Sequence, residues 1–131
     1  MLTPKRQLGN LGEDLAVNFL RRQGLKILDR NFSTKFGELD IVAAKPGGFF
    51  KGKIEEMIFA EVKTVKAGVL LALAAQNVHF SKKERLKKTA KIYLKIKKIP
   101  PEIPWRIDVI LVAFDESTGL AEVEHLKNAV W

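Results

Sequence analysis

The sequence contains no cysteine and no long run of apolar residues. The absence of cysteine excludes disulfides, cysteine-ligated zinc and a thiol nucleophile. The longest apolar run, Val69 to Ala75, is far shorter than the roughly 20 residues that a membrane-spanning helix needs. The beginning of the chain, 1–6, lacks the apolar core of a signal peptide. We therefore expect a protein without a membrane segment, located in the cytoplasm.

Positive charge is concentrated in one part of the chain. The net charge is +8, and residues 82–98 contain nine Lys or Arg against one acid, so the remainder is balanced. Such a segment favours a polyanion, in particular nucleic acid, although a solvated lysine-rich helix face is equally compatible with it. Lys82, Arg85 and Lys88 lie at helical spacing and are the candidate phosphate contacts.

The length of 131 residues suits one domain (1–131), and a hydrophobic content of 47% favours a folded core. Apolar periodicity predicts a first helix capped by Thr3 and stopped at Gly24. A capping box of Ser81 and Glu84 begins a second helix, which ends before Pro100. Strand-like runs follow the pattern of buried β structure at 25–32, 38–44, 57–65, 105–114 and 120–126, the last as an edge strand.

The predicted order, α-β-β-β-α-β-β, indicates an α/β fold with a central mixed five-stranded sheet flanked by helices. The segment between the third strand and the second helix is harder to interpret. Its apolar stretch, Val69 to Ala75, favours a packed loop; the alternatives are a short helix that serves as a lid, a dimer patch or a partner-binding surface.

Charged residues interrupt two predicted strands. Alternate side chains of a strand share a face, which places Glu38 and Asp40 with Val42, and Glu61 with Lys63. A turn joins the two strands, so in an antiparallel hairpin the Asp40 and Glu61 carboxylates converge beside Lys63. Burying such charges without compensation is costly. They form either an internal ion pair with Lys63 or a site for a divalent cation, since magnesium is typically held by one or two carboxylates, water and phosphate oxygens.

An ordered set of motifs identifies a family resemblance. An Asp followed, on the adjoining strand, by Glu-X-Lys is similar to the core motif of the PD-(D/E)XK nuclease superfamily. Six blocks together resemble the YraN family of small bacterial proteins, which are predicted endonucleases similar in fold to archaeal Holliday junction resolvases. The blocks are Gly12-Glu13, Arg30-Asn31, Gly37-Glu38-Leu39-Asp40-Ile41, Glu61-Val62-Lys63-Thr64, Lys82 with Arg85-Leu86, and Arg106-Ile107-Asp108-Val109.

The resemblance covers residues 9–112 and implies a restriction-endonuclease-like fold. It implies that Asp40 and Glu61 are ligands of Mg²⁺ or Mn²⁺, that Lys63 is the catalytic lysine, and that Glu13 approaches the metal from the first helix, directly or through water. An ordinary exposed Glu13 beside Asp14 is the alternative. Glycines at 9 and 12 favour close packing of this helix, because glycine inside a helix is otherwise unfavourable.

The implied function is a metal-dependent endonuclease that hydrolyses phosphodiester bonds in nucleic acid, with DNA, branched DNA included, as the expected substrate. The alternative is a non-catalytic nucleic-acid-binding or adaptor protein that keeps the nuclease fold. Resolvase-like folds are often dimers, so fold analogy alone favours a homodimer.

The sequence departs from the family pattern at two positions. Leu39 stands where the superfamily has proline, and Val65 stands where the family often has arginine, so a phosphate contact made by that arginine would be missing.

Several other residues favour structural roles. Arg106 and Asp108 share a face of a central strand, and we expect them to pair structurally. Tyr93 and Trp105 are expected in the core, rather than as stacking platforms for bases. The two histidines, His79 and His125, have no spacing partner and are not expected to be ligands.

Overall fold

The computed structural model describes residues 4–48, 52–66, 80–115 and 117–130. Three features of the sequence lie outside these ranges: the Thr3 cap, the apolar segment Val69 to Ala75 and His79. None of the described helices is both long enough and apolar enough to cross a membrane.

Two helices and five strands of the described chain follow one another in the predicted order. They are α1 (Pro4–Arg22), β1 (Lys26–Thr34), β2 (Gly37–Pro46), β3 (Ile54–Lys66), α3 (Phe80–Ile96), β4 (Trp105–Asp115) and β5 (Leu120–Val130). The predicted α/β fold class is confirmed. The observed and predicted ends of the elements differ most in β5, which continues beyond the predicted end at 126. Its pairing with β4 resumes past a bulge, where Ile107 lies opposite Val130.

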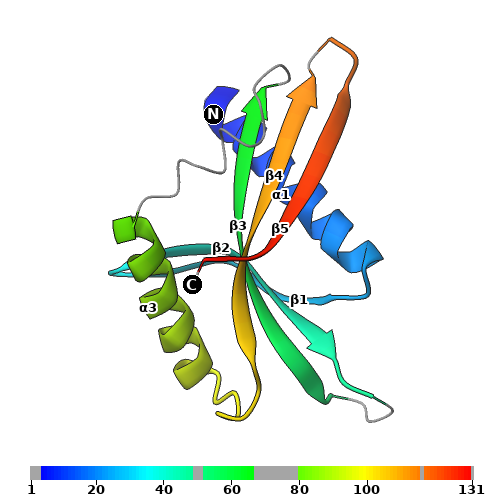
Figure 1. Cartoon of the computed structure of the whole chain (residues 1–131). Helices are drawn as coiled ribbons and strands as arrows, with labels where there is room; N and C mark the ends of the chain where they lie inside the picture. The colour runs from blue at the N-terminus through cyan, green and yellow to red at the C-terminus, as the bar shows by residue number, and fades with distance from the viewer. Residues whose placement is uncertain (1–3, 49–51, 67–79, 116, 131) are drawn as a thin grey trace.

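The strands form one mixed sheet in the order β1-β2-β3-β4-β5. Neighbours pair antiparallel, except β3 and β4, which run parallel. A parallel pair needs a crossover, and α3 lies within that connection. The two helices cover opposite faces of the strongly twisted sheet, and β5 is an edge strand as predicted (Figure 1).

Each face of the sheet carries its own apolar core, because successive strand residues point to opposite sides. In β3, Ile58 packs toward α1 and Phe59 packs toward α3. The α1 contribution is Ala16, Val17 and Leu20, and the α3 contribution is Leu86, Ala90 and Tyr93. Tyr93 and Trp105 pack in the α3-side core, which confirms their predicted role.

Strand β2 does not keep strict alternation. Leu39 and Val42 both pack in the α3-side core, although an odd spacing would place them on opposite faces. At the level of Asp40, the neighbouring strand has Asn31 with a φ of 55°, so the hairpin is irregular at this point. The prediction that Glu38, Asp40 and Val42 share one face is therefore wrong, since Glu38 is turned toward α1.

Helix α1 approaches β3 closely at one glycine. A Cβ built on Gly12 would overlap the hydroxyl of Thr64, whereas a Cβ on Gly9 meets no described atom within 4 Å. The expectation of close packing is thus confirmed for Gly12, whereas Gly9 has no close neighbour among the described atoms. The residue after Gly12, Glu13, lies near Asp40 of β2.

Replacing these two glycines should have opposite effects on stability. Gly12→Ala should lower the free energy of unfolding by about 1–3 kcal/mol, because the added methyl group overpacks the contact with Thr64. Gly9→Ala should raise it by roughly 0.5–1 kcal/mol, because alanine favours the helix and has open space. Urea unfolding of both variants measures the difference. Equal effects would contradict the close approach of α1 to β3.

Candidate functional site

The site begins where β2 separates from β3. The two strands pair as far as Ile41 opposite Ala60, and β3 then continues beside β4 alone. Beyond the last pair, the Val62 amide donates a hydrogen bond to Asp40 Oδ2 at 2.8 Å. The carboxylate replaces the backbone carbonyl that a continued ladder would provide, so Asp40 is held in the fork between the strands.

Four carboxylates gather at this fork. The pKa of Asp40 is raised to about 7. Burial is the largest cause, the hydrogen bond from the Val62 amide opposes it, and three neighbouring acids contribute to the rise: Glu61, Glu13 and Glu38. They come from three elements, α1, β2 and β3. Because the repulsion among them needs compensation, this cluster is suited to a proton or a cation.

Glu13 belongs to the cluster, rather than to the exposed surface. Its side chain is 17% exposed and lies 3.8 Å from the Arg30 guanidinium, whereas Asp14 is 59% exposed and pairs with Arg30 at 2.8 Å. The side-chain amide nitrogen of Asn31 donates to Glu13 at 3.1 Å and to Glu38 at 3.0 Å. Burial is the main cause that raises the pKa of Glu13, with Arg30 opposing it. The alternative of an ordinary exposed Glu13 is therefore wrong.

Glu61 is the second strand acid of the site. Its side chain is 14% exposed, and Oε1 forms an ion pair with the Lys82 ammonium from α3. The other oxygen, Oε2, is buried and has no hydrogen-bond partner among the described residues. A buried unsatisfied carboxylate oxygen is costly and calls for a further positive partner.

Lys63 is half-buried and follows Glu61 by two residues on β3, as predicted. It makes no ion pair with the described residues, so the alternative of an internal ion pair of Lys63 with Asp40 or Glu61 is absent from them. The structure brings Lys82 to Glu61 instead.

The oxygen donors at the fork are of the kind that a hard divalent cation prefers. Asp40 and Glu61 lie on neighbouring strands, and Glu61 Oε2 is available. Among the described residues, no group of three or more His, Cys, Asp or Glu could hold a metal ion by itself. Two carboxylates are nevertheless a typical protein contribution to a magnesium site, in which water and phosphate oxygens complete the coordination.

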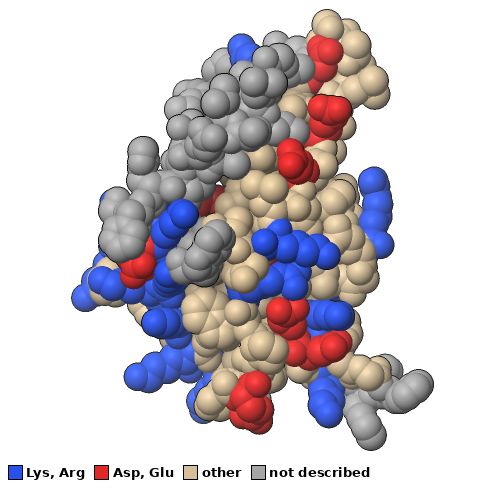
Figure 2. Space-filling model, in the orientation of Figure 1, with Lys and Arg blue, Asp and Glu red and all other residues tan. Residues whose placement is uncertain are grey.

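The positive charge lies beside this fork. Figure 2 shows Lys and Arg side chains gathered over the α3 side of the molecule, on the left of the view. Arg85 and Lys88 are exposed on α3, whereas Lys82 turns toward Glu61. The three predicted phosphate contacts thus divide: one lies in the carboxylate site, and two are on the open face of the helix.

A second buried polar cluster was only half predicted. Asp108 is fully buried and accepts hydrogen bonds from Arg106 Nε at 3.0 Å, His125 Nε2 at 2.6 Å and the Asn128 amide at 2.7 Å. Burial alone would raise the pKa of Asp108, but these hydrogen bonds outweigh it and lower the pKa. Arg106 also pairs with Glu56 at 2.7 Å.

This cluster confirms the structural pairing of Arg106 with Asp108. The cluster spans the bulge between β4 and β5. The spacing of residues in the sequence did not indicate that His125 is a hydrogen-bond partner of Asp108. Asp108 lies on β4 opposite Ala60, so strand β3 separates it from Asp40 on β2. The Asp108 cluster therefore supports the sheet and is separate from the fork.

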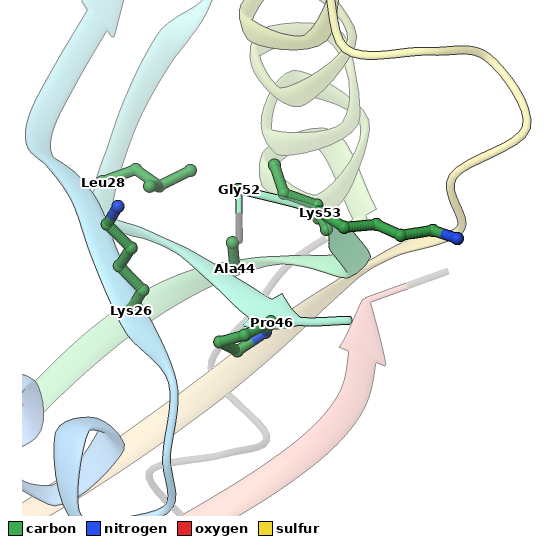
Figure 3. A pocket seen from close by; sticks show the side chains of 7 residues that line it. Lys26, Leu28, Ala44, Pro46, Gly52 and Lys53 are labelled. Carbon is green, nitrogen blue, oxygen red and sulfur yellow. The ribbon is translucent and has the colours of Figure 1, made fainter. Parts of the chain in front are cut away.

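A small cavity of about 130 Å³ lies at the opposite end of the β2–β3 hairpin (Figure 3). It is lined by Lys26, Leu28, Ala44, Pro46, Gly52, Lys53 and Ile54. The Lys53 side chain extends away from the other lining residues. The described residues that line it include no acid and none of the predicted site residues.

The fold and the site define a class of protein: a mixed α/β sheet domain with carboxylates in a strand fork and a basic helix beside them. The chain belongs to the family described as "Uncharacterised protein family UPF0102", whose model matches residues 12–112. That match includes Glu13, Asp40, Glu61 and Lys63, and it confirms the YraN part of the resemblance.

Several UPF0102 proteins align with almost the whole chain. One from Desulforamulus reducens is 32% identical and covers 99% of this chain and 100% of the relative. One from Dictyoglomus turgidum is 37% identical, with 95% and 97% covered. One from Vibrio parahaemolyticus is 39% identical, with 98% and 96% covered.

The raised pKa of Asp40 predicts that Asp40→Asn stabilises the free protein in a pH-dependent way. Ionised Asp40 opposes folding, so wild-type stability should fall as pH rises from 3.8 to about 7, with the full penalty present above that. Asparagine can still accept the Val62 hydrogen bond but carries no charge. The gain over wild type should grow across this window to at most about 4 kcal/mol, measured by urea unfolding between about pH 4 and 9.

Asp14→Asn is the matched control, since Asp14 is an exposed acid of α1 whose ion pair is worth about 1 kcal/mol or less. It should show no gain that grows with pH. A pH-independent effect of Asp40→Asn would contradict the raised pKa of Asp40.

Proposed function

We propose that this protein is a metal-dependent endonuclease that hydrolyses phosphodiester bonds in nucleic acid, DNA in particular. The observation that carries the proposal is the pair of carboxylates at the strand fork, Asp40 and Glu61; Glu61 Oε2 is buried without a partner in the described part of the chain. An ordinary structural ion pair would leave neither this orphaned oxygen nor a cluster of repelling acids.

Asp40 and Glu61 would hold Mg²⁺ or Mn²⁺ between the two strands. When bound, such a cation polarises the phosphate and makes water a better nucleophile near neutral pH. Glu13 adds negative charge at the fork from α1, and its contacts with Arg30 and Asn31 fix its position. The chain itself thus supplies a pre-arranged acidic site whose repulsion a cation relieves.

Lys63 is the residue that would act on the reacting groups. It shares the β3 face of Glu61 and makes no ion pair with the described residues, so its ammonium is available to phosphate or water. An ammonium there can orient the attacking water or stabilise charge on the phosphate in the transition state.

The basic face of α3 would hold the substrate backbone. Arg85 and Lys88 are exposed next to the fork, and phosphate contacts of this kind position a strand without reading its sequence. Binding should weaken with salt, because each neutralised phosphate releases counterions.

A non-catalytic nucleic-acid-binding protein is the second candidate. The observation that favours it is the ion pair of Lys82 with Glu61, which already provides a positive partner for one carboxylate. Salt-sensitive binding without cleavage in any divalent cation would identify this alternative.

Cleavage of labelled nucleic acids tests the enzyme directly. Single-stranded, duplex, flap and four-way-junction DNA, together with RNA, are incubated with Mg²⁺, Mn²⁺ or EDTA. We expect metal-dependent cutting that Asp40→Asn and Lys63→Ala each reduce by about 10²-fold or more, a usual effect of losing a group that acts on the reacting atoms.

Lys95→Ala is the matched control, because Lys95 is an exposed lysine near the far end of α3. It should cut at close to the wild-type rate. Unchanged cleavage in Asp40→Asn would falsify the nuclease proposal.

The ion pair of Lys82 with Glu61 predicts competition with a metal ion. Lys82→Gln should raise the Mn²⁺ affinity of the free protein about tenfold, since one charge-assisted contact of roughly 1.5 kcal/mol no longer has to be broken. Isothermal titration calorimetry without nucleic acid measures this affinity.

Lys87→Gln serves as the control for the general loss of a positive charge, because Lys87 lies on the same helix and pairs with Glu84. Equal Mn²⁺ affinities in the Lys82 and Lys87 variants would show that Lys82 does not compete with the metal ion for Glu61.

A further inference from the structure

One aromatic residue beside the basic helix has no role in either core. Phe36 lies in the turn between β1 and β2, is half-buried, and belongs to neither apolar cluster of the described residues. Phe32, four residues earlier on β1, packs in the α3-side core with Tyr93. The Phe36 ring is therefore placed by the turn, rather than by core packing.

Two lysines lie over this ring. The Lys35 ammonium is 5.2 Å and the Lys88 ammonium is 5.3 Å from the ring centroid, within the range of cation–π attraction. Both lysines are exposed, so their side chains are free to move to phosphate groups. An aromatic face combined with mobile cations is the arrangement that binds single-stranded nucleic acid, with bases stacked on the ring and phosphates on the lysines.

The turn is fastened to α3 by hydroxyl groups. Thr34 Oγ1 accepts a hydrogen bond from the Phe36 amide at 3.1 Å and lies 3.2 Å from Thr89 Oγ1, which in turn donates to the Arg85 carbonyl at 2.9 Å. Thr89 is fully buried. The position of Phe36 relative to the basic face of α3 is thus set by buried contacts.

The same helix connects the ring with the carboxylates. Lys82 contacts Glu61 and Lys88 contacts Phe36, and six helical residues span about 9 Å. Along β2, Phe36 precedes Asp40 by four residues, a reach of at most about 13 Å. At 3.4 Å per stacked nucleotide, this corresponds to about four nucleotides or fewer.

We propose that Phe36, with Lys35 and Lys88, is a stacking platform for an unpaired base close to the scissile phosphate, so that the substrate carries a single-stranded segment there. The inference rests on the proposed nucleic-acid function and adds the substrate class to it. A fully paired duplex has no free base for the ring, and it would contact the lysines alone.

Binding in EDTA tests the platform separately from cleavage. Fluorescence anisotropy compares a labelled oligothymidine, an oligouridine and a duplex of equal length on wild type, Phe36→Ala and Phe36→Leu. Both variants should bind the single strands roughly 5- to 150-fold more weakly, the effect of losing one stacked base, and should bind the duplex as wild type does. Because leucine keeps the apolar bulk, a loss of affinity in Phe36→Leu measures the contribution of the aromatic face.

Two further measurements separate stacking from charge and from packing. Phe36→Trp should retain single-strand affinity, and its fluorescence should be quenched by oligothymidine beyond the quenching seen in wild type. The salt dependence of binding should be unchanged in Phe36→Leu and shallower in Lys88→Gln, because only the second variant removes a charge. Thermal unfolding of Phe36→Leu shows whether the turn is intact.

The outcomes distinguish this inference from the proposal beneath it. Wild type that binds single strands, with both Phe36 variants binding equally well, overturns the platform and leaves the nuclease proposal standing. Equal losses on single strands and duplex also overturn it, since they indicate a structural role for the ring. Wild type that binds no nucleic acid overturns both.

Discussion

The hydrogen bond from the Val62 amide to Asp40 is the contact on which the site depends. Where β2 leaves β3, this amide would lack its ladder partner, and an unpaired buried amide is costly. A side-chain carboxylate satisfies it and is thereby fixed inside the fork, where burial raises its pKa. The same contact therefore completes the sheet and holds a buried acid in place.

Two helix contacts add the remaining charges from opposite faces of the sheet. The absence of a side chain at Gly12 lets α1 lie against Thr64, and this delivers Glu13 to the fork. From the other face, α3 brings Lys82 to Glu61. The acids repel one another, and the cation that relieves the repulsion in the free protein comes from the helix that also carries the basic surface. The cation that pairs with Glu61 and the basic surface thus belong to one element.

Two acids outside the fork, Asp108 and Asp29, have hydrogen-bond donors of their own. Asp108 has hydrogen bonds from Arg106, His125 and the Asn128 amide, and they outweigh its burial. Asp29 accepts a hydrogen bond from the Tyr93 hydroxyl at 2.6 Å and fastens α3 to β1. The fork differs from these clusters, because its acids outnumber its described cations and, among the described residues, one of its carboxylate oxygens has no hydrogen-bond partner. A group of acids with too few cations to balance it is typical of a binding site.

The sequence by itself determined the element order, the mixed sheet, the edge position of β5 and the alternating core of β3, because periodicity and capping act over a few residues. It also indicated Asp40, Glu61 and Lys63 as neighbours, since a hairpin joins their strands. Only the tertiary structure decided that Lys82 pairs with Glu61, that His125 pairs with Asp108, that Glu38 turns toward α1 and that Phe36 meets Lys88. Each of these contacts depends on the twist of the sheet or on the crossover through α3. Both bring together residues that are far apart in the chain, and the spacing of residues along the sequence does not encode this geometry.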